Sequence, residues 1–460
     1  MQRVSRLAAW GGVFILFLGY CVAFIDRQIL SLLVQPIRAD LQISDTQFSL
    51  LQGFAFALFY AVCGLPIGRL VDRGHRALIL AAGMALWSLF TCLCGLSRNF
   101  HQLFFFRMGV GAGEATVVPV TYSLIADYFP PERRGLALGL FGSGVYFGMG
   151  GSMVVGGMLI DALEAAGPMK VILLGELQPW QTALLIVGTP GIFLAMLALF
   201  LPEPRRSLQS LTMYSRATSS ARAPSRSAWN YYRSIGSAVA LHHLTAAFIS
   251  VAMYAALAWT PEHFRRTFDV PLAQSAIWAG AVILISGSVG VITGGLMSDR
   301  ALKSGIAAAR MKVLLAAALL AIPASLLLAF APGPASALIG LGGVTLFISM
   351  LTSVGAAGVQ ELMPSDLRGF GAAVYQLTVN LIALTCGPIS VAILTDYVFA
   401  DDQKLYVALG VAMSVTLLIA AALAFAGLRP YERAAKRALE RPEEDGLQGM
   451  NTSGVKSVFG

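Results

Sequence analysis

The chain has 460 residues, of which 57% are hydrophobic and 12% charged, whereas a typical soluble protein has about 45 to 50% and about 25%. A soluble fold of this composition could not cover its surface with polar groups, so we predict an integral membrane protein. The net charge of +8 is explained by membrane topology, as argued below, and gives no support to nucleic-acid binding.

Apolar segments of about 20 residues, the length a helix needs to cross a bilayer core of roughly 30 Å, recur along the chain. We predict twelve such helices, at residues 10–36, 46–71, 76–97, 102–127, 135–163, 179–201, 238–260, 272–297, 310–331, 335–360, 369–395 and 403–427. One long polar stretch separates the sixth from the seventh. The predicted organisation is an N-terminal six-helix bundle (1–201), a cytoplasmic linker (202–233), a C-terminal six-helix bundle (234–428) and a cytoplasmic tail (429–460).

The distribution of basic residues predicts the orientation, because cytoplasmic loops carry the excess of Lys and Arg. With the N-terminus inside, the inner segments hold 24 of the 32 basic residues, the outer loops hold six and two fall within helices. We therefore expect both termini to be cytoplasmic.

An internal repeat is the most specific feature of the organisation. The sequence from Gly68 to Arg73 follows the second span, and a matching one from Gly295 to Arg300 follows the eighth, at an offset of 227 residues. The sequence from Phe129 to Gly135 follows the fourth span, and its match from Met363 to Gly369 follows the tenth, at an offset of 234 residues. Such parallel halves are typical of secondary transporters, which bind substrate near the midplane between the repeats.

Two of these motifs resemble those of a known superfamily. The loop from Gly68 to Arg76, and Arg107 with Gly111 and Gly113 in the fourth span, resemble the loop motif and the basic helix motif of the major facilitator superfamily. The resemblance covers nearly the whole chain. It implies an all-α membrane protein with twelve transmembrane helices in two pseudo-symmetric six-helix bundles, the major facilitator fold.

Shorter pieces point to one family within that superfamily. The sequences from Phe24 to Gln28, from Gly113 to Ala115, from Pro131 to Gly135 and from Trp259 to Pro261 resemble the Spinster family, which includes sphingosine-1-phosphate and lysophospholipid transporters. The short loops suggest a bacterial member, and hence a multi-pass protein of the inner membrane.

Charged side chains at bilayer depth are costly, about 2.5 to 3.5 kcal/mol each, and mark function. Four lie well inside the predicted spans: Asp26, Arg27, Arg107 and Glu114. Arg107 and Glu114 are seven residues apart and share one face of a helix, so they can pair with Asp26 and Arg27 of the first span. We expect Arg27 to lie between Glu114 and Arg107 in depth.

These four charges suggest a coupled site. Asp26 or Glu114 would accept a proton, Arg27 would contact a phosphate or carboxylate, and Arg107 would modulate the carboxylates. The Spinster resemblance implies the same four positions as the substrate and proton residues. The alternative is that the pairs only fix helix packing.

Charges at the cytoplasmic ends of the second and fourth spans form a second group. The superfamily resemblance implies a gate there, which would keep the outward-facing state closed toward the cytoplasm; the alternative is that the charges only set topology. The residues predicted for this cytoplasmic gate are Gly68, Asp72, Arg73, Arg76, Asp127, Arg133 and Arg134.

The C-terminal spans carry no acid near mid-depth, so we predict an asymmetric cavity with the charged head of a substrate against the N-terminal half. Tyr254, Gln376 and Asn380 are the weaker candidates for lining this cavity, with helix packing as the alternative. We expect the His242–His243 pair to lie at the membrane interface rather than to bind a metal. The sequence shows no other group of residues with the spacing of a metal site.

The sequence therefore predicts a monomeric, proton-coupled, alternating-access transporter for an amphipathic anionic lipid such as a lysophospholipid or sphingolipid phosphate. A carrier or exporter of a water-soluble organic anion or drug is the main alternative. A lipid-modifying enzyme or a sensor without transport are the others. No Walker-type nucleotide motif is present, and neither a cofactor nor a catalytic residue is predicted.

Overall fold

The computed structural model describes residues 5–171, 175–204, 226–363 and 368–440, and for a few of these, Asp72 among them, only the backbone. Within these residues, twelve helices are long and apolar enough to cross a membrane. They confirm the predicted twelve-span, all-α fold. Beyond that prediction, a short antiparallel hairpin pairs β1 with β2, with Met169 opposite Leu177.

The first half of the chain supplies six spans, some of them broken into shorter helices. Their elements are α1 (Arg6–Gln28), η1 (Ile29–Leu32), α2 (Val34–Leu41), α3 (Asp45–Ser49), η2 (Leu50–Phe54), α4 (Ala55–Arg73), α5 (Arg76–Cys94), α6 (Phe100–Glu114), α7 (Val117–Tyr128), α8 (Pro131–Ala166), β1 (Met169–Val171), β2 (Gly175–Leu177) and α9 (Pro179–Ala198).

The second half supplies the other six spans. Their elements are α11 (Arg226–Ser234), α12 (Gly236–Phe268), α13 (Leu272–Lys303), α14 (Ala309–Phe330), α15 (Pro334–Leu362), α16 (Arg368–Ile393), η4 (Leu394–Phe399), η5 (Asp402–Lys404) and α17 (Leu405–Glu440). The division of the chain at residues 201, 233 and 428 stays a prediction. We note that α11 begins within the segment assigned to the linker, and that α17 continues past residue 428 to Glu440.

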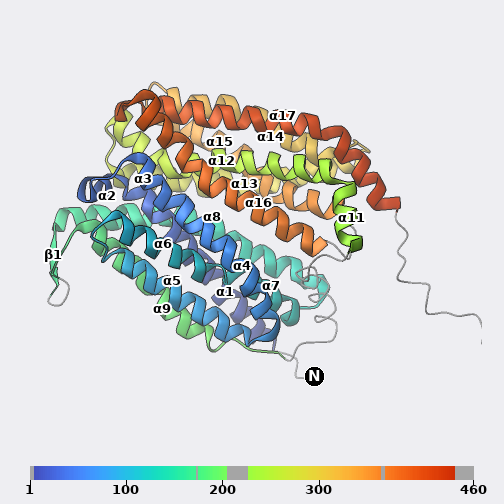
Figure 1. Cartoon of the computed structure of the whole chain (residues 1–460), viewed down its shortest axis with the longest axis horizontal. Helices are drawn as coiled ribbons and strands as arrows, with labels where there is room; N and C mark the ends of the chain where they lie inside the picture. The colour runs from blue at the N-terminus through green and yellow to red at the C-terminus, as the bar shows by residue number, and fades with distance from the viewer. Residues whose placement is uncertain (1–4, 172–174, 205–225, 364–367, 441–460) are drawn as a thin grey trace, which may run out of the picture.

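The two halves lie side by side along the long axis of the molecule (Figure 1). In the N half, α1 packs on α8, and α5 packs on α6 and α9; in the C half, α12 packs on α16 and α17, and α14 on α15 and α17. We call the end where α1 begins and α17 finishes the terminal end, and the opposite end, with α2, α3 and the hairpin, the far end.

Glycine brings the two halves into close contact where α8 packs on α13. A Cβ atom added at Gly150 would lie 2.9 Å from the carbonyl oxygen of Gly280, and one added at Gly280 would lie 2.7 Å from that of Gly150. Only residues without a side chain allow helices to approach this closely. At the far end, α3 and η2 also pack on α16, and η1 packs on α12.

The fourth span is interrupted directly after Glu114. Pro119 has no backbone N–H, so it cannot donate to the carbonyl of Ala115 as a continuous helix would require. The chain ends α6 at Glu114 and starts α7 at Val117, and Thr116 donates its backbone N–H and its hydroxyl to the carbonyl of Gly113. The sequence thus places a buried carboxylate at a break between two helices.

Candidate functional site

An ion pair joins the first span to the fourth inside the N half. The Nη2 atom of Arg27 lies 2.5 Å from Oε2 of Glu114, and the Glu114 side chain is only 1% exposed. The structure therefore brings together two of the four deep charges predicted from the sequence. The prediction relied on similar depths of these residues in the first and fourth spans.

Aromatic rings surround the Arg27 guanidinium. Its Cζ atom lies 4.7 Å from the ring centre of Phe24, 4.3 Å from that of Phe56 and 5.6 Å from that of Tyr60. Each of these contacts favours the cation electrostatically. The Nε atom of Arg27 is buried and has no hydrogen-bond partner within the described part of the chain, so its N–H is left unsatisfied.

Tyr254 brings the C half to this position. It lies on α12, near enough to Arg27 for charges on the two groups to influence each other, as does Tyr60. Tyr20 belongs to the same group and stacks on Phe141 of α8 with ring centres 4.3 Å apart. Arg27 therefore lies among aromatic side chains from both halves.

Asp26 and Arg107, the other two deep charges, have no ion-pair partner among the residues that the structure describes. Asp26 is 0% exposed; its Oδ2 atom accepts a hydrogen bond from Thr91 at 3.3 Å, and its Oδ1 atom has none. Arg107 is 1% exposed, with its Nε atom 3.5 Å from the carbonyl oxygen of Leu51 and its Nη2 atom without a partner.

These two residues interact only at longer range. The charges of Glu114 and Arg107 both act on Asp26, although neither residue forms an ion pair or a hydrogen bond with it. A buried charge without a hydrogen-bonded partner is expensive, and such an arrangement is typical of groups that change protonation or bind a charged ligand. The structure thus makes one of the expected pairs and leaves the second open.

At the terminal end, Arg76 forms a buried cluster. Its Nη1 atom lies 2.5 Å from Oδ2 of Asp127 and also donates to Ser123, and its Nε atom donates to Glu203 at 2.7 Å. The structure therefore joins Arg76 and Asp127, both predicted for the gate. The sequence analysis missed Glu203, which follows α9 in the segment assigned to the linker and so looked like a solvated charge.

The other residues predicted for the gate are placed less closely. Arg134 donates to the carbonyl oxygens of Phe129 at 3.0 Å and of Ala126 at 2.8 Å, at the end of α7. Arg73 and Arg133 are exposed. Gly68 lies within α4, and the side chain of Asp72 is outside the described residues.

In the C half, the two neutral candidates of α16 contact each other. The Nε2 atom of Gln376 donates to Oδ1 of Asn380 at 3.0 Å, one helical turn away. His242 and His243 are buried near the beginning of α12. Their Nδ1 atoms are 3.4 Å apart, and both rings contact Tyr375. The pair is thus buried within the protein.

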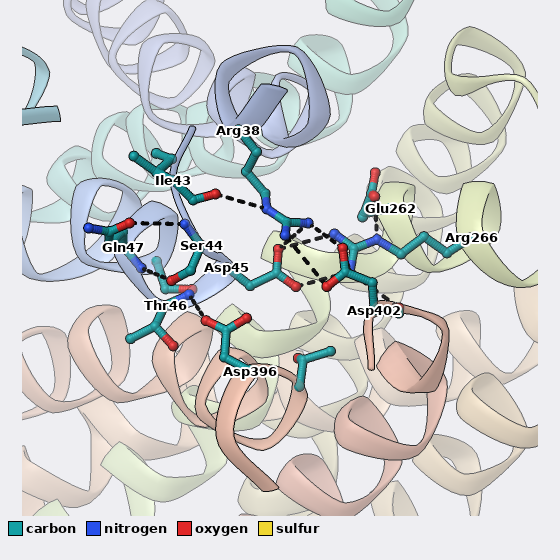
Figure 2. Close-up of polar contacts among 12 residues, drawn as sticks. Arg38, Ile43, Ser44, Asp45, Thr46, Gln47, Glu262, Arg266, Asp396 and Asp402 are labelled. Atoms are coloured by element: carbon teal, nitrogen blue, oxygen red, sulfur yellow. Dashed lines mark hydrogen bonds and ion pairs between the residues drawn. The ribbon is translucent and has the colours of Figure 1, made fainter. Parts of the chain in front are cut away.

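A charged network at the far end connects the two halves and was not predicted (Figure 2). Arg266 of α12 binds Asp45 of α3 through two hydrogen bonds of 2.9 and 3.1 Å, and its Nε atom donates to Glu262. Arg38 of α2 lies 2.9 Å from both Asp45 and Asp402. We call Arg38, Asp45, Glu262, Arg266 and Asp402 the far-end network.

The far-end network is largely buried where the two halves meet. Asp45 is 0% exposed and the Arg266 side chain 2%, and beside them the backbone N–H of Thr46 donates to Asp396 of η4 at 2.6 Å. Carboxylate oxygens of Asp45, Asp396 and Asp402 lie within 4.8 Å of one another, and Arg38 and Arg266 supply the opposite charge. The sequence signal was a set of acids and arginines at the ends of spans that share one side of the membrane, which the charge count had treated as topology alone.

Comparisons with known proteins agree with this architecture. Residues 16–388 match the family model of the Major Facilitator Superfamily. The chain belongs to this superfamily. Its members are transporters rather than enzymes, and the twelve spans make the chain a multi-pass membrane transporter.

The chain is similar to an efflux pump, to a probable sugar-acid transporter and to a Spinster protein. An MFS-type efflux pump of Mycolicibacterium smegmatis is 28% identical, with 95% of each chain covered. A probable L-galactonate transporter of Escherichia coli is 26% identical over 66% of this chain and 64% of its own. Protein spinster of Drosophila melanogaster is 28% identical over 45% of this chain and 31% of its own.

Solved structures confirm the resemblance to the Spinster family. A bacterial homologue of the human lysosomal transporter Spinster, in an inward-facing and occupied conformation, superimposes with a TM-score of 0.75 at 25% identity, covering 94% of this chain and 98% of that one. Its inward-facing, unoccupied structure gives a TM-score of 0.73 at 23% identity, with 95% and 98% covered.

Proposed function

We propose that the protein is a proton-coupled, alternating-access carrier of an amphipathic anionic lipid, such as a lysophospholipid or a sphingolipid phosphate. The observation that carries this proposal is the unequal state of the four deep charges. Arg27 and Glu114 form an ion pair, while Asp26 and Arg107 are buried without one. Such a set responds to one added proton or one added anion by exchanging partners.

The partner exchange follows from charge balance. With both acids ionised, the four side chains sum to zero. An anionic head group that binds the free edge of Arg27 competes with Glu114 for the guanidinium, and a proton on Glu114 or on Asp26 restores neutrality. Binding of the anion and binding of the proton therefore favour each other, which is the thermodynamic basis of coupled transport.

The surroundings of Arg27 fit an amphipathic ligand better than a fully polar one. Phe24, Phe56 and Tyr60 lie around the guanidinium, so a bound head group would have apolar surface directly beside it. In this proposal Tyr254 touches the ligand from the C half, and Gln376 and Asn380 lie further along the same cavity. The resemblance of the sequence to the Spinster family, which includes lysophospholipid transporters, supports a lipid substrate.

Alternating access needs a barrier at each end, and each end has a candidate. With both termini cytoplasmic, the far end faces outward and the far-end network keeps it closed in this conformation. The cytoplasmic gate would consist of Arg76, Asp127 and Arg134, with Asp72, Arg73, Arg133 and Gly68 of the loop motif. We place the protein in the inner membrane as a monomer.

A second candidate function is transport of a water-soluble organic anion or a drug. The relatives in Escherichia coli and Mycolicibacterium smegmatis favour it, because one is named as a sugar-acid transporter and the other as an efflux pump. Arg27 could bind a sugar-acid carboxylate as well as a phosphate. The two functions differ in whether the ligand carries an apolar chain.

Flux into proteoliposomes separates these functions. The purified protein is reconstituted, a pH gradient is imposed, and uptake of a labelled lysophospholipid is compared with that of labelled galactonate. We expect gradient-dependent lysophospholipid flux that Asp26→Asn and Glu114→Gln abolish and that Arg27→Ala weakens through binding. Asp161→Asn, which changes an exposed acid on α8, is the matched control. Equal flux for Asp26→Asn, Glu114→Gln and the parent protein would reject proton coupling at this site, and flux of galactonate alone would establish the second function.

A further inference from the structure

Two prolines of the C half each leave a backbone carbonyl without its helical partner. Pro261 lies inside α12 and Pro388 inside α16. A proline has no N–H, so it cannot donate to the carbonyl four residues earlier in its helix. The carbonyls concerned belong to Leu257 and Leu384, and a buried carbonyl needs another partner.

The N half supplies the partner of the first carbonyl. The Nε2 atom of Gln28 donates to the carbonyl oxygen of Leu257 at 2.8 Å. Gln28 is buried, and a second hydrogen bond of 3.0 Å from the same Nε2 atom to Ser31 fixes its side chain. A residue of α1 therefore completes the hydrogen bonding of a helix in the opposite half.

The second carbonyl is covered by the N half as well. Gly53 of η2 lies directly on Leu384: a Cβ atom added at Gly53 would collide with the Leu384 carbonyl oxygen and would lie 3.2 Å from its carbon. Close by, Ser49 donates to the carbonyl oxygen of Pro388 at 3.2 Å. Both prolines thus open their helices at the places where the first two spans of the N half make contact.

We propose that the Leu257 and Leu384 carbonyls are docking points that hold the far end closed, and that Gln28 is a positioning residue linking this closure to the charged site. The proposal rests on alternating access as proposed above. When the far end opens, Gln28 must leave Leu257, and water must replace its amide. Because Gln28 directly follows Arg27, a movement of α1 on ligand binding changes both contacts together.

The decisive variant is Gln28→Met, which keeps the size of the side chain and removes the donor. It is measured by the distance between spin labels at positions 98 and 335, which are exposed at the far end of the N half and the C half, in a protein whose five cysteines are replaced. We expect the ratio of far-open to far-closed molecules to rise about fivefold to tenfold, the effect of one buried hydrogen bond. Gln274→Met, at an exposed glutamine of α13, is the matched control.

Pro261→Ala separates a coupling role from a merely structural one. Alanine restores an N–H to position 261, so Leu257 gains a donor within its own helix and no longer needs Gln28. We expect Gln28→Met to shift the label distance much less in the Pro261→Ala protein than in the parent. Gly53→Ala should open the far end independently, through the other proline.

These outcomes decide the proposal without reference to the substrate. An unchanged label distance in Gln28→Met, or a shift of equal size with and without Pro261, would overturn it. If Gln28→Met does not fold, an unchanged label distance in Gly53→Ala overturns it. A shift in label distance in a protein that moves no lysophospholipid would retain the docking points and reject the proposed transport function.

Discussion

Removing Arg266 should open the far end more than removing Arg38, although both contact Asp45. In Arg266→Met, Asp45 loses two hydrogen bonds to a side chain that is only 2% exposed but keeps Arg38 at 2.9 Å, and Glu262 keeps Arg265 at 2.8 Å. No acid is left wholly unpaired, so the cost lies below the 3 to 5 kcal/mol of a broken buried pair. Hydrogen bonds to charged groups are worth about 1.5 to 3 kcal/mol, which corresponds to roughly a tenfold to hundredfold shift toward the far-open state.

Arg38→Met should have a smaller effect. Asp45 keeps both hydrogen bonds from Arg266, and Asp402, whose side chain is 48% exposed, is solvated by water once Arg38 is gone. An exposed pair of this kind contributes about 0.2 to 1 kcal/mol, so we expect at most a fivefold shift toward the far-open state. Raising the salt concentration should reduce the contribution of Arg38 and leave that of Arg266 nearly unchanged.

Both variants can be followed with the spin labels at positions 98 and 335, or by the rate at which a water-soluble maleimide modifies a cysteine placed at position 49, which is buried where α3 meets α16. In the maleimide assay, where position 98 carries no label, Arg98→Met, at an exposed arginine of the same end, is the control for loss of charge alone. The reasoning is refuted if Arg38→Met opens the far end as much as Arg266→Met, or if neither differs from Arg98→Met.

Three further predictions concern stability. Arg76→Met leaves the buried Asp127 unpaired and should lower the free energy of unfolding by about 3 to 5 kcal/mol, measured by thermal unfolding in detergent against Arg133→Met, an exposed neighbour; equal losses would contradict it. Gly150→Val should force α8 away from α13 and lower the melting temperature, whereas Gly139→Val, where an added Cβ meets nothing within 4 Å, should not. Asp26→Asn should abolish proton coupling without lowering the melting temperature, because it removes a buried carboxylate that has no ion-pair partner; a clear fall in melting temperature would point to a packing role instead.

The twelve spans and the Arg27–Glu114 pair could be predicted because their signals are local. A run of about 20 apolar residues identifies a span without any knowledge of its neighbours, and a charge inside such a run is rare enough to stand out. The depth of each charge follows from its position along a straight helix. Arg27 and Glu114 could therefore be identified as candidate partners from the sequence alone.

The far-end network and Gln28 could not be predicted in this way, because their partners are set by how the two halves meet. Asp45 and Arg266 stand at the ends of spans, where charges usually serve topology, and only the closed far end turns them into a buried pair. Gln28 is neutral and looks like any polar residue beside two charges. Its role depends on Pro261, more than 200 positions later in the chain, and on the carbonyl that this proline leaves free.

Asp26, Arg27 and Gln28 follow one another in α1, yet each reaches a different partner. Asp26 accepts from Thr91 of α5, Arg27 pairs with Glu114 of α6, and Gln28 donates to Leu257 of α12. Successive residues of a helix point about 100° apart, so three neighbouring residues face three different directions. Each of them can contact a different helix only because this turn of α1 is surrounded by other helices. The proton, the anion and the opposite half would then act on the same turn of α1, and none of them could move it without changing the contacts of the other two.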